Sequence, residues 1–119
     1  MSTTSILRSV LDQWKAGVDA HDPGAVGKLF TEDAIFQGLH PYSVGPAGVA
    51  QYYDSQPLGM KAQYDIVETR QLSEDLVLGY LEVAFSFVDR PTLEVNLSVI
   101  VRRTGEDWRI AHYQVSKLA

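Results

Sequence analysis

Apolar residues recur at intervals of three and four near the start of the chain, and they alternate with polar residues over its second half. The first spacing places apolar side chains along one side of a helix, and it predicts a helix over residues 3–21. A second, short helix is expected from Pro23 to Phe30, because Asp22 can cap it and proline suits its first turn. A third is expected from Ala47 to Ser55.

The alternation that begins near residue 60 is typical of half-buried strands. Four such strands are expected, joined by short turns, over residues 60–73, 75–88, 92–103 and 107–117. One shorter strand is expected earlier, from Ala34 to Gln37. Helices followed by consecutive strands predict the α+β class, with an antiparallel meander as its sheet.

The turn between the last two strands decides which side chains share a face of the sheet. Thr104-Gly105-Glu106 allows a two-residue loop, which would put His112 opposite Leu97. It also allows a three-residue loop with a left-handed glycine. We favour the three-residue loop because it keeps apolar and polar side chains on separate faces. The pairs it predicts are Ser98 with His112 and Asn96 with Gln114.

One face of this hairpin would then be polar but uncharged: Asn96, Ser98, His112 and Gln114. Solvated strand faces usually carry Lys, Glu or Arg, so a face of this kind near apolar neighbours suggests the lining of a pocket. The alternative is that it is simply the solvent side of the sheet.

The other face of the hairpin is apolar: Val95, Leu97, Val99, Tyr113 and Val115. We predict that these residues lie on the outer face of the sheet. Because a monomer rarely exposes an apolar patch of this size, we also predict a homodimer packed through it.

Composition argues against several partners and chemistries. The 119 residues include 10 basic and 15 acidic side chains, a formal net charge of −5, so neither nucleic acid nor an anionic membrane surface is an expected partner. With no cysteine and no metal-binding spacing among the three histidines, we expect no metal site and no cofactor. No signal peptide or membrane-spanning segment is evident, so we expect one cytoplasmic domain over residues 1–119.

Several motifs in order resemble the SnoaL-like branch of the nuclear transport factor 2 superfamily. They are the helix bearing Trp14, the Asp22-Pro23 break, and the strings over 29–34, 44–49 and 108–116. The last string is also similar to the association domain of calcium/calmodulin-dependent kinase II. The resemblance implies a cone-shaped, cystatin-like fold: a curved antiparallel sheet wrapped around the N-terminal helix, with two shorter helices and an open end that forms a pocket. It also implies that dimers form through the outer sheet face.

The candidate chemistry is centred on His112, which can act as a general acid or base near neutral pH. Ser98 or Gln114 could orient its ring, and Asn96 could donate to a substrate oxygen. The alternative is a half-buried histidine with a structural role only. Further predicted substrate contacts are the aromatic residues Trp14, Tyr53 and Phe85 and the loop residue His40.

Two functions follow from these residues. The first is a SnoaL-like small-molecule enzyme, an isomerase, cyclase or dehydratase that acts on a neutral, largely apolar carbonyl compound. The second is a ligand-binding or dimerisation module of the same fold without catalysis. A steroid-isomerase-like site would need a strand carboxylate as base and a tyrosine as oxyanion donor, and we do not find that pattern in the sequence.

Overall fold

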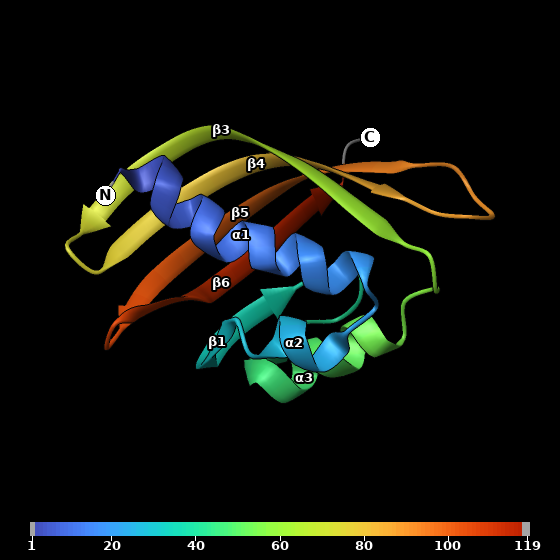
Figure 1. Ribbon diagram of the computed structural model, residues 1–119, viewed down its shortest axis with the longest axis horizontal. Helices are drawn as coiled ribbons and strands as arrows, with labels where there is room; N and C mark the ends of the chain where they lie inside the picture. Colours follow the sequence, from blue (N-terminus) through green and yellow to red (C-terminus); the bar gives the residue numbers. More distant parts are fainter. Residues whose placement is uncertain (1, 118–119) are drawn as a thin grey trace.

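Residues 2–117, which the computed structural model describes, form three helices and a six-stranded sheet (Figure 1). The helices are α1 (Thr3–Asp19), α2 (Pro23–Gly27) and α3 (Gly45–Asp54). The strands are β1 (Phe30–Gln37), β2 (Ser43–Val44), β3 (Lys61–Ser73), β4 (Leu76–Ser86), β5 (Leu93–Thr104) and β6 (Asp107–Lys117). No helix in this part of the chain is both long and apolar enough to cross a membrane.

The sheet has the strand order β2-β1-β6-β5-β4-β3. Strands β3 to β6 form the predicted antiparallel meander, and the α+β prediction is confirmed. The sequence did not indicate that β1 adds to the meander in parallel beside β6, with Phe30 opposite Ile110 and Phe36 opposite Tyr113. Strand β1 is longer than the predicted strand and begins at Phe30, and both Phe30 and Phe36 are buried.

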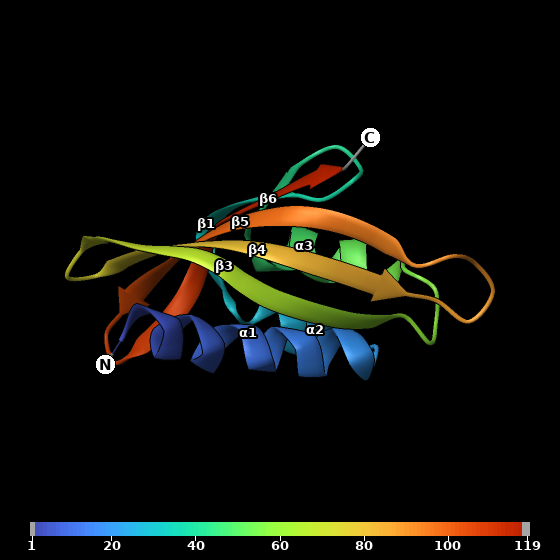
Figure 2. The ribbon, with the colours of Figure 1, turned by 90° about the horizontal axis from the view of Figure 1, so that it is seen from above.

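All three helices lie on one side of the sheet, which curves around α1 (Figures 1 and 2). Helix α1 begins at the cap residue Ser2, whose hydroxyl accepts a hydrogen bond from the Ser5 amide at 3.1 Å. At its other end, Asp19 accepts a hydrogen bond from the Ala62 amide at 2.8 Å and pairs with Lys15 at 2.7 Å. These contacts attach α1 to β3 and fix the position of Trp14.

The core lies between the apolar stripe of α1 and the apolar face of the meander. The buried residues of α1 are Ile6, Leu7, Val10, Leu11, Trp14, Gly17 and Val18. Across from them, the buried residues of the last hairpin include Val95, Leu97, Val99, Tyr113 and Val115. The prediction that these five residues form an outer dimer interface is therefore wrong. The sheet has one strongly apolar face, and the helices cover it because burial of apolar surface drives folding.

The predicted register of the last hairpin is also wrong. The loop has two residues, Gly105 and Glu106, because Thr104 pairs directly with Asp107. An irregularity between Ile100 and Val101 then places one extra residue in β6. The resulting pairs are Ile100 with His112, Ser98 with Gln114 and Asn96 with Ser116. The polar residues still share one face, as predicted, but that face is the outer one.

Candidate ligand-binding cavity

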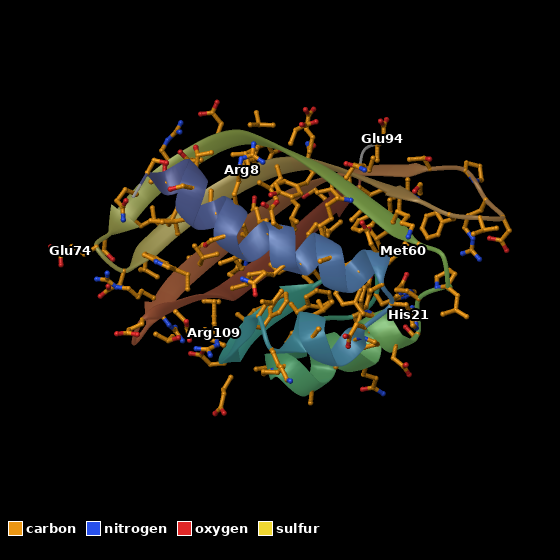
Figure 3. The ribbon with its side chains drawn as sticks, in the orientation of Figure 1. Arg8, His21, Met60, Glu74, Glu94 and Arg109 are labelled. Carbon is orange, nitrogen blue, oxygen red and sulfur yellow. The ribbon has the colours of Figure 1, made fainter. Side chains whose placement is uncertain are left out.

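A cavity with a volume of about 40 Å³ and an open mouth lies between α3, the segment before β3 and the inner face of β4, β5 and β6. Its wall is mainly apolar and aromatic, and consists of Leu39, Tyr52, Tyr53, Gln56, Met60, Phe85, Phe87, Leu93, Val95, Tyr113 and Val115. Figure 3 shows Met60 near His21 at one end of the molecule, with Glu74 at the other. Small-molecule sites have linings of this kind, mainly apolar with a few polar groups, and a cavity of this size admits only part of an organic ligand.

Three aromatic side chains form a hydrogen-bonded chain at this cavity, with Tyr53 and Tyr113 in its wall and Trp14 behind it. The indole Nε1 of Trp14 donates to the Tyr53 hydroxyl at 3.1 Å, and the Tyr53 and Tyr113 hydroxyls lie 3.1 Å apart. All three side chains are buried. Tyr53 comes from α3, Tyr113 from β6 and Trp14 from α1, so the packing of all three elements sets this geometry.

The donors and acceptors in this chain leave one proton unused. The indole N–H of Trp14 can only donate, so it occupies an acceptor position on Tyr53. The two phenols have two hydroxyl protons, and only one of them serves the bond between Tyr53 and Tyr113. The other proton is left to donate, and both phenols line the cavity. Either phenol can donate in the bond between them, so the unused proton belongs to Tyr113 when Tyr53 donates, and to Tyr53 when Tyr113 donates.

Both phenols are donors rather than bases at neutral pH. Burial raises the pKa of Tyr53, although its hydrogen bonds to Tyr113 and Trp14 oppose the shift. Burial also raises the pKa of Tyr113, and the neighbouring Tyr53 adds to this effect. The site therefore offers a neutral O–H to an oxygen or nitrogen acceptor on a ligand.

The loop after β1 forms one side of the cavity mouth. The Gln37 side chain donates hydrogen bonds to the Gly38 carbonyl at 2.9 Å and to the His40 carbonyl at 2.7 Å, which folds the loop back on itself. A Cβ atom on Gly38 would lie 2.7 Å from the Tyr52 ring, so only glycine allows the loop to pack so closely. Leu39, which is half-exposed, thereby lines the cavity.

The predicted aromatic contacts lie at or behind this cavity. Tyr53 and Phe85 are part of its wall. Trp14 lies behind them, with its ring centroid 6.1 Å from that of Phe85 in an edge-to-face arrangement. His40 is not part of the wall, and its ring centroid lies 5.8 Å from that of the wall residue Tyr52.

The structure places the four predicted polar residues on the outer face of the sheet, away from the cavity. His112 lies between Ile100 of β5 and Ile35 of β1. Ser98 and Gln114 are cross-strand neighbours, and Asn96 lies beside Glu82 in an open hollow. The prediction that they line the concave pocket is wrong, because the apolar residues between them face α1.

Sequence reasoning missed the polar groups that the cavity does contain. The alternation predicts Tyr113 on the outer face, and it predicts no role in the site for Tyr52, Gln56 or the apolar Met60. One signal could have identified Tyr113: it alternates with Ala111 and Val115 on the more apolar face of β6. A long amphipathic helix such as α1 requires an apolar surface of that kind to cover it. Within residues 2–117, no three His, Asp or Glu side chains converge to form a metal site.

No protein-family model matches the sequence, and neither does any curated protein. Solved structures do match. A ketosteroid isomerase-like protein from Erwinia carotovora is 20% identical with a TM-score of 0.82, covering 97% of this chain and 95% of its own. An NTF2-like protein with a cystatin-like fold from Novosphingobium aromaticivorans is 16% identical with a TM-score of 0.83, covering 98% of this chain and 82% of its own.

A third similar structure is a candidate calcium/calmodulin-dependent protein kinase II association domain from Xanthomonas campestris. It is 14% identical with a TM-score of 0.83, covering 94% of this chain and 85% of its own. The chain therefore has the cystatin-like fold of nuclear transport factor 2-like proteins, and the predicted fold is confirmed. Sequence identity at this level establishes the fold and not an activity, because this fold carries several unrelated functions.

Proposed function

We propose that this protein binds a compact, largely apolar small molecule in the cavity, with an oxygen of the ligand accepting a hydrogen bond from Tyr113. The observation that carries the proposal is the unused hydroxyl proton in a mainly apolar wall. A buried donor without an acceptor destabilises the protein, so a ligand that supplies one gains from the match. A ketone or another neutral carbonyl compound has the required acceptor.

Binding without catalysis is the better-supported of the two predicted functions. The residues of the cavity wall include no carboxylate, histidine or lysine, so none of them is a general base at neutral pH. His112 lies on the opposite face of the sheet and does not reach the cavity. The ketosteroid isomerase-like neighbour shares the fold, and its printed name is no evidence of isomerase activity in this chain.

Acetophenone and isopropylbenzene test this proposal, because they have nearly the same shape and only acetophenone carries an acceptor oxygen. We expect the protein to bind acetophenone more tightly. Tyr113→Phe should weaken acetophenone binding about two- to tenfold, the value of one neutral hydrogen bond, and leave isopropylbenzene binding unchanged. Isothermal titration calorimetry measures both affinities. The matched control is Tyr80→Phe, which removes a hydroxyl from the outer face.

Two outcomes would contradict the proposal. One is that neither compound binds to the unmodified protein. The other is that Tyr113→Phe weakens the two compounds equally, since the hydroxyl would then contribute nothing specific to the acceptor.

We also propose that the chain forms a homodimer through the outer face of the sheet, although not through the residues first predicted. The register aligns five side chains in one row across this face: Leu78, Ile100, His112, Ile35 and Val44. Ile35 is 45% exposed and Val44 is 55% exposed. An uncovered row that is mostly apolar supports contact with a second copy of the same face.

Ile35→Asp should convert this dimer to a monomer at micromolar concentration, because it would place two charges in an apolar interface. Leu72→Asp is the control, since Leu72 is 51% exposed on β3 and lies outside the row. Sedimentation velocity measures the mass of each variant. A monomeric unmodified protein, or an Ile35→Asp variant that stays dimeric, would contradict the proposed interface.

A further inference from the structure

We infer that Gln56 determines which ligand the cavity accepts, because its side-chain amide binds a hydroxyl group of the ligand. The ligand is then a neutral hydroxy ketone, with its carbonyl oxygen at the phenol pair Tyr53 and Tyr113 and its hydroxyl at Gln56. This inference rests on the proposed binding function and names the class of ligand.

Gln56 is held beside Tyr53 by the last turn of α3. The Gln56 backbone N–H donates a hydrogen bond to the Tyr53 carbonyl at 3.2 Å. Ser55 between them has a φ of −78° and a ψ of −10°, so the helical path continues through it. Residues three apart on a helix lie on the same side, and both Tyr53 and Gln56 line the cavity. Tyr53 is buried and Gln56 is half-buried, which places the Gln56 side chain nearer to solvent.

The amide of Gln56 is available to a ligand. The wall has four polar side chains, Tyr52, Tyr53, Gln56 and Tyr113. The hydroxyls of Tyr53 and Tyr113 bond to each other, and the Tyr52 hydroxyl packs against the loop at Gly38. Within residues 2–117, no hydrogen bond joins the Gln56 amide to another group. Because Gln56 is half-exposed, water serves this amide in the free protein, and a ligand group can replace that water.

The chemistry of the amide favours a ligand hydroxyl over a carboxylate or an alkyl group. Glutamine has two N–H donors and one carbonyl acceptor. A hydroxyl both donates and accepts, so it can bind either end of the amide. A carboxylate only accepts, and the wall carries no cation to offset the loss of its hydration. An alkyl group in the same place would leave the amide without a partner.

The test uses two pairs of aryl ketones. It compares para-(hydroxymethyl)acetophenone with para-ethylacetophenone, and it compares the two meta isomers in the same way. The members of each pair have nearly the same shape and differ by a hydroxyl in place of a methyl group. Isothermal titration calorimetry gives the ratio of the two affinities. We expect Gln56→Met to lower the preference for the hydroxyl compound about two- to tenfold in at least one pair, the value of one neutral hydrogen bond.

Gln56→Leu, a second apolar replacement, should lower the ratio in the same way. The matched control is Gln51→Met, because Gln51 is exposed on α3 and does not line the cavity, and it should leave both ratios unchanged. If the ethyl compounds bind and neither Gln56 variant lowers a ratio, or if Gln51→Met lowers one as much, the inference is overturned while the proposed function stands. If none of the four compounds binds, the proposed function and this inference both fail.

Discussion

Replacing Trp14 with alanine should lower the free energy of unfolding by about 3–5 kcal/mol. The side chain is fully buried, and its ring lies 6.5 Å from that of Tyr64, 6.1 Å from that of Phe85 and 6.3 Å from that of Tyr113. Truncation would leave a large cavity and remove the donor to Tyr53. Because domains of this size have about 5–15 kcal/mol of stability, the loss would be a large fraction of the total.

Urea denaturation followed by circular dichroism measures the effect, and the slope of the transition should stay unchanged. Trp108→Ala is the matched control, because Trp108 is only half-buried and its ring is covered by Arg103 at 5.7 Å. That variant should lose clearly less stability. Equal losses from the two substitutions would contradict the central position of Trp14 in the core.

Gly45→Ala is the second substitution with a large expected effect. Gly45 has a φ of 85°, a left-handed conformation that costs alanine about 1–2 kcal/mol. A Cβ atom there would also lie 2.7 Å from the backbone oxygen of Glu32, which cannot move without disturbing β1. We therefore expect the variant to unfold at a much lower temperature or not to fold.

Gly105→Ala separates the two causes. Gly105 has a φ of 71°, so it carries a similar backbone penalty, but a Cβ atom there would meet nothing within 4 Å. Calorimetric melting curves should show a modest loss of about 1–2 kcal/mol for Gly105→Ala and a larger loss for Gly45→Ala. Similar losses in both variants would mean that the contact with Glu32 is relieved by a small shift.

The sequence was sufficient to predict the elements whose signal is local. The apolar stripe that contains Trp14 predicted α1, and the alternation after residue 60 predicted the four long strands. Asp22 caps α2 as expected, by accepting a hydrogen bond from the Ala25 amide at 3.2 Å. The parallel pairing of β1 with β6 was not predictable in this way, because it joins residues far apart in the chain.

The candidate site was misplaced because alternation along a strand separates two faces without showing which one is covered. Asn96 and His112 do share a face, as predicted, and Val95 and Tyr113 share the other. Only the position of α1 shows that the second face is the inner one. A bulge such as the one in β6 also changes cross-strand partners without a clear signal in the sequence.

The most direct test of the proposed binding mode is a methyl NMR titration of Met60. Met60 lines the cavity, and the chain has two methionines, so ¹³C-methyl labelling gives a simple spectrum that Met60→Leu assigns. A bound ligand would contact this methyl group. We predict that the Met60 methyl signal moves and then saturates as acetophenone is added. In Tyr113→Phe, saturation should require a higher concentration of acetophenone. A Met60 signal that does not move while acetophenone binds elsewhere on the protein would contradict it.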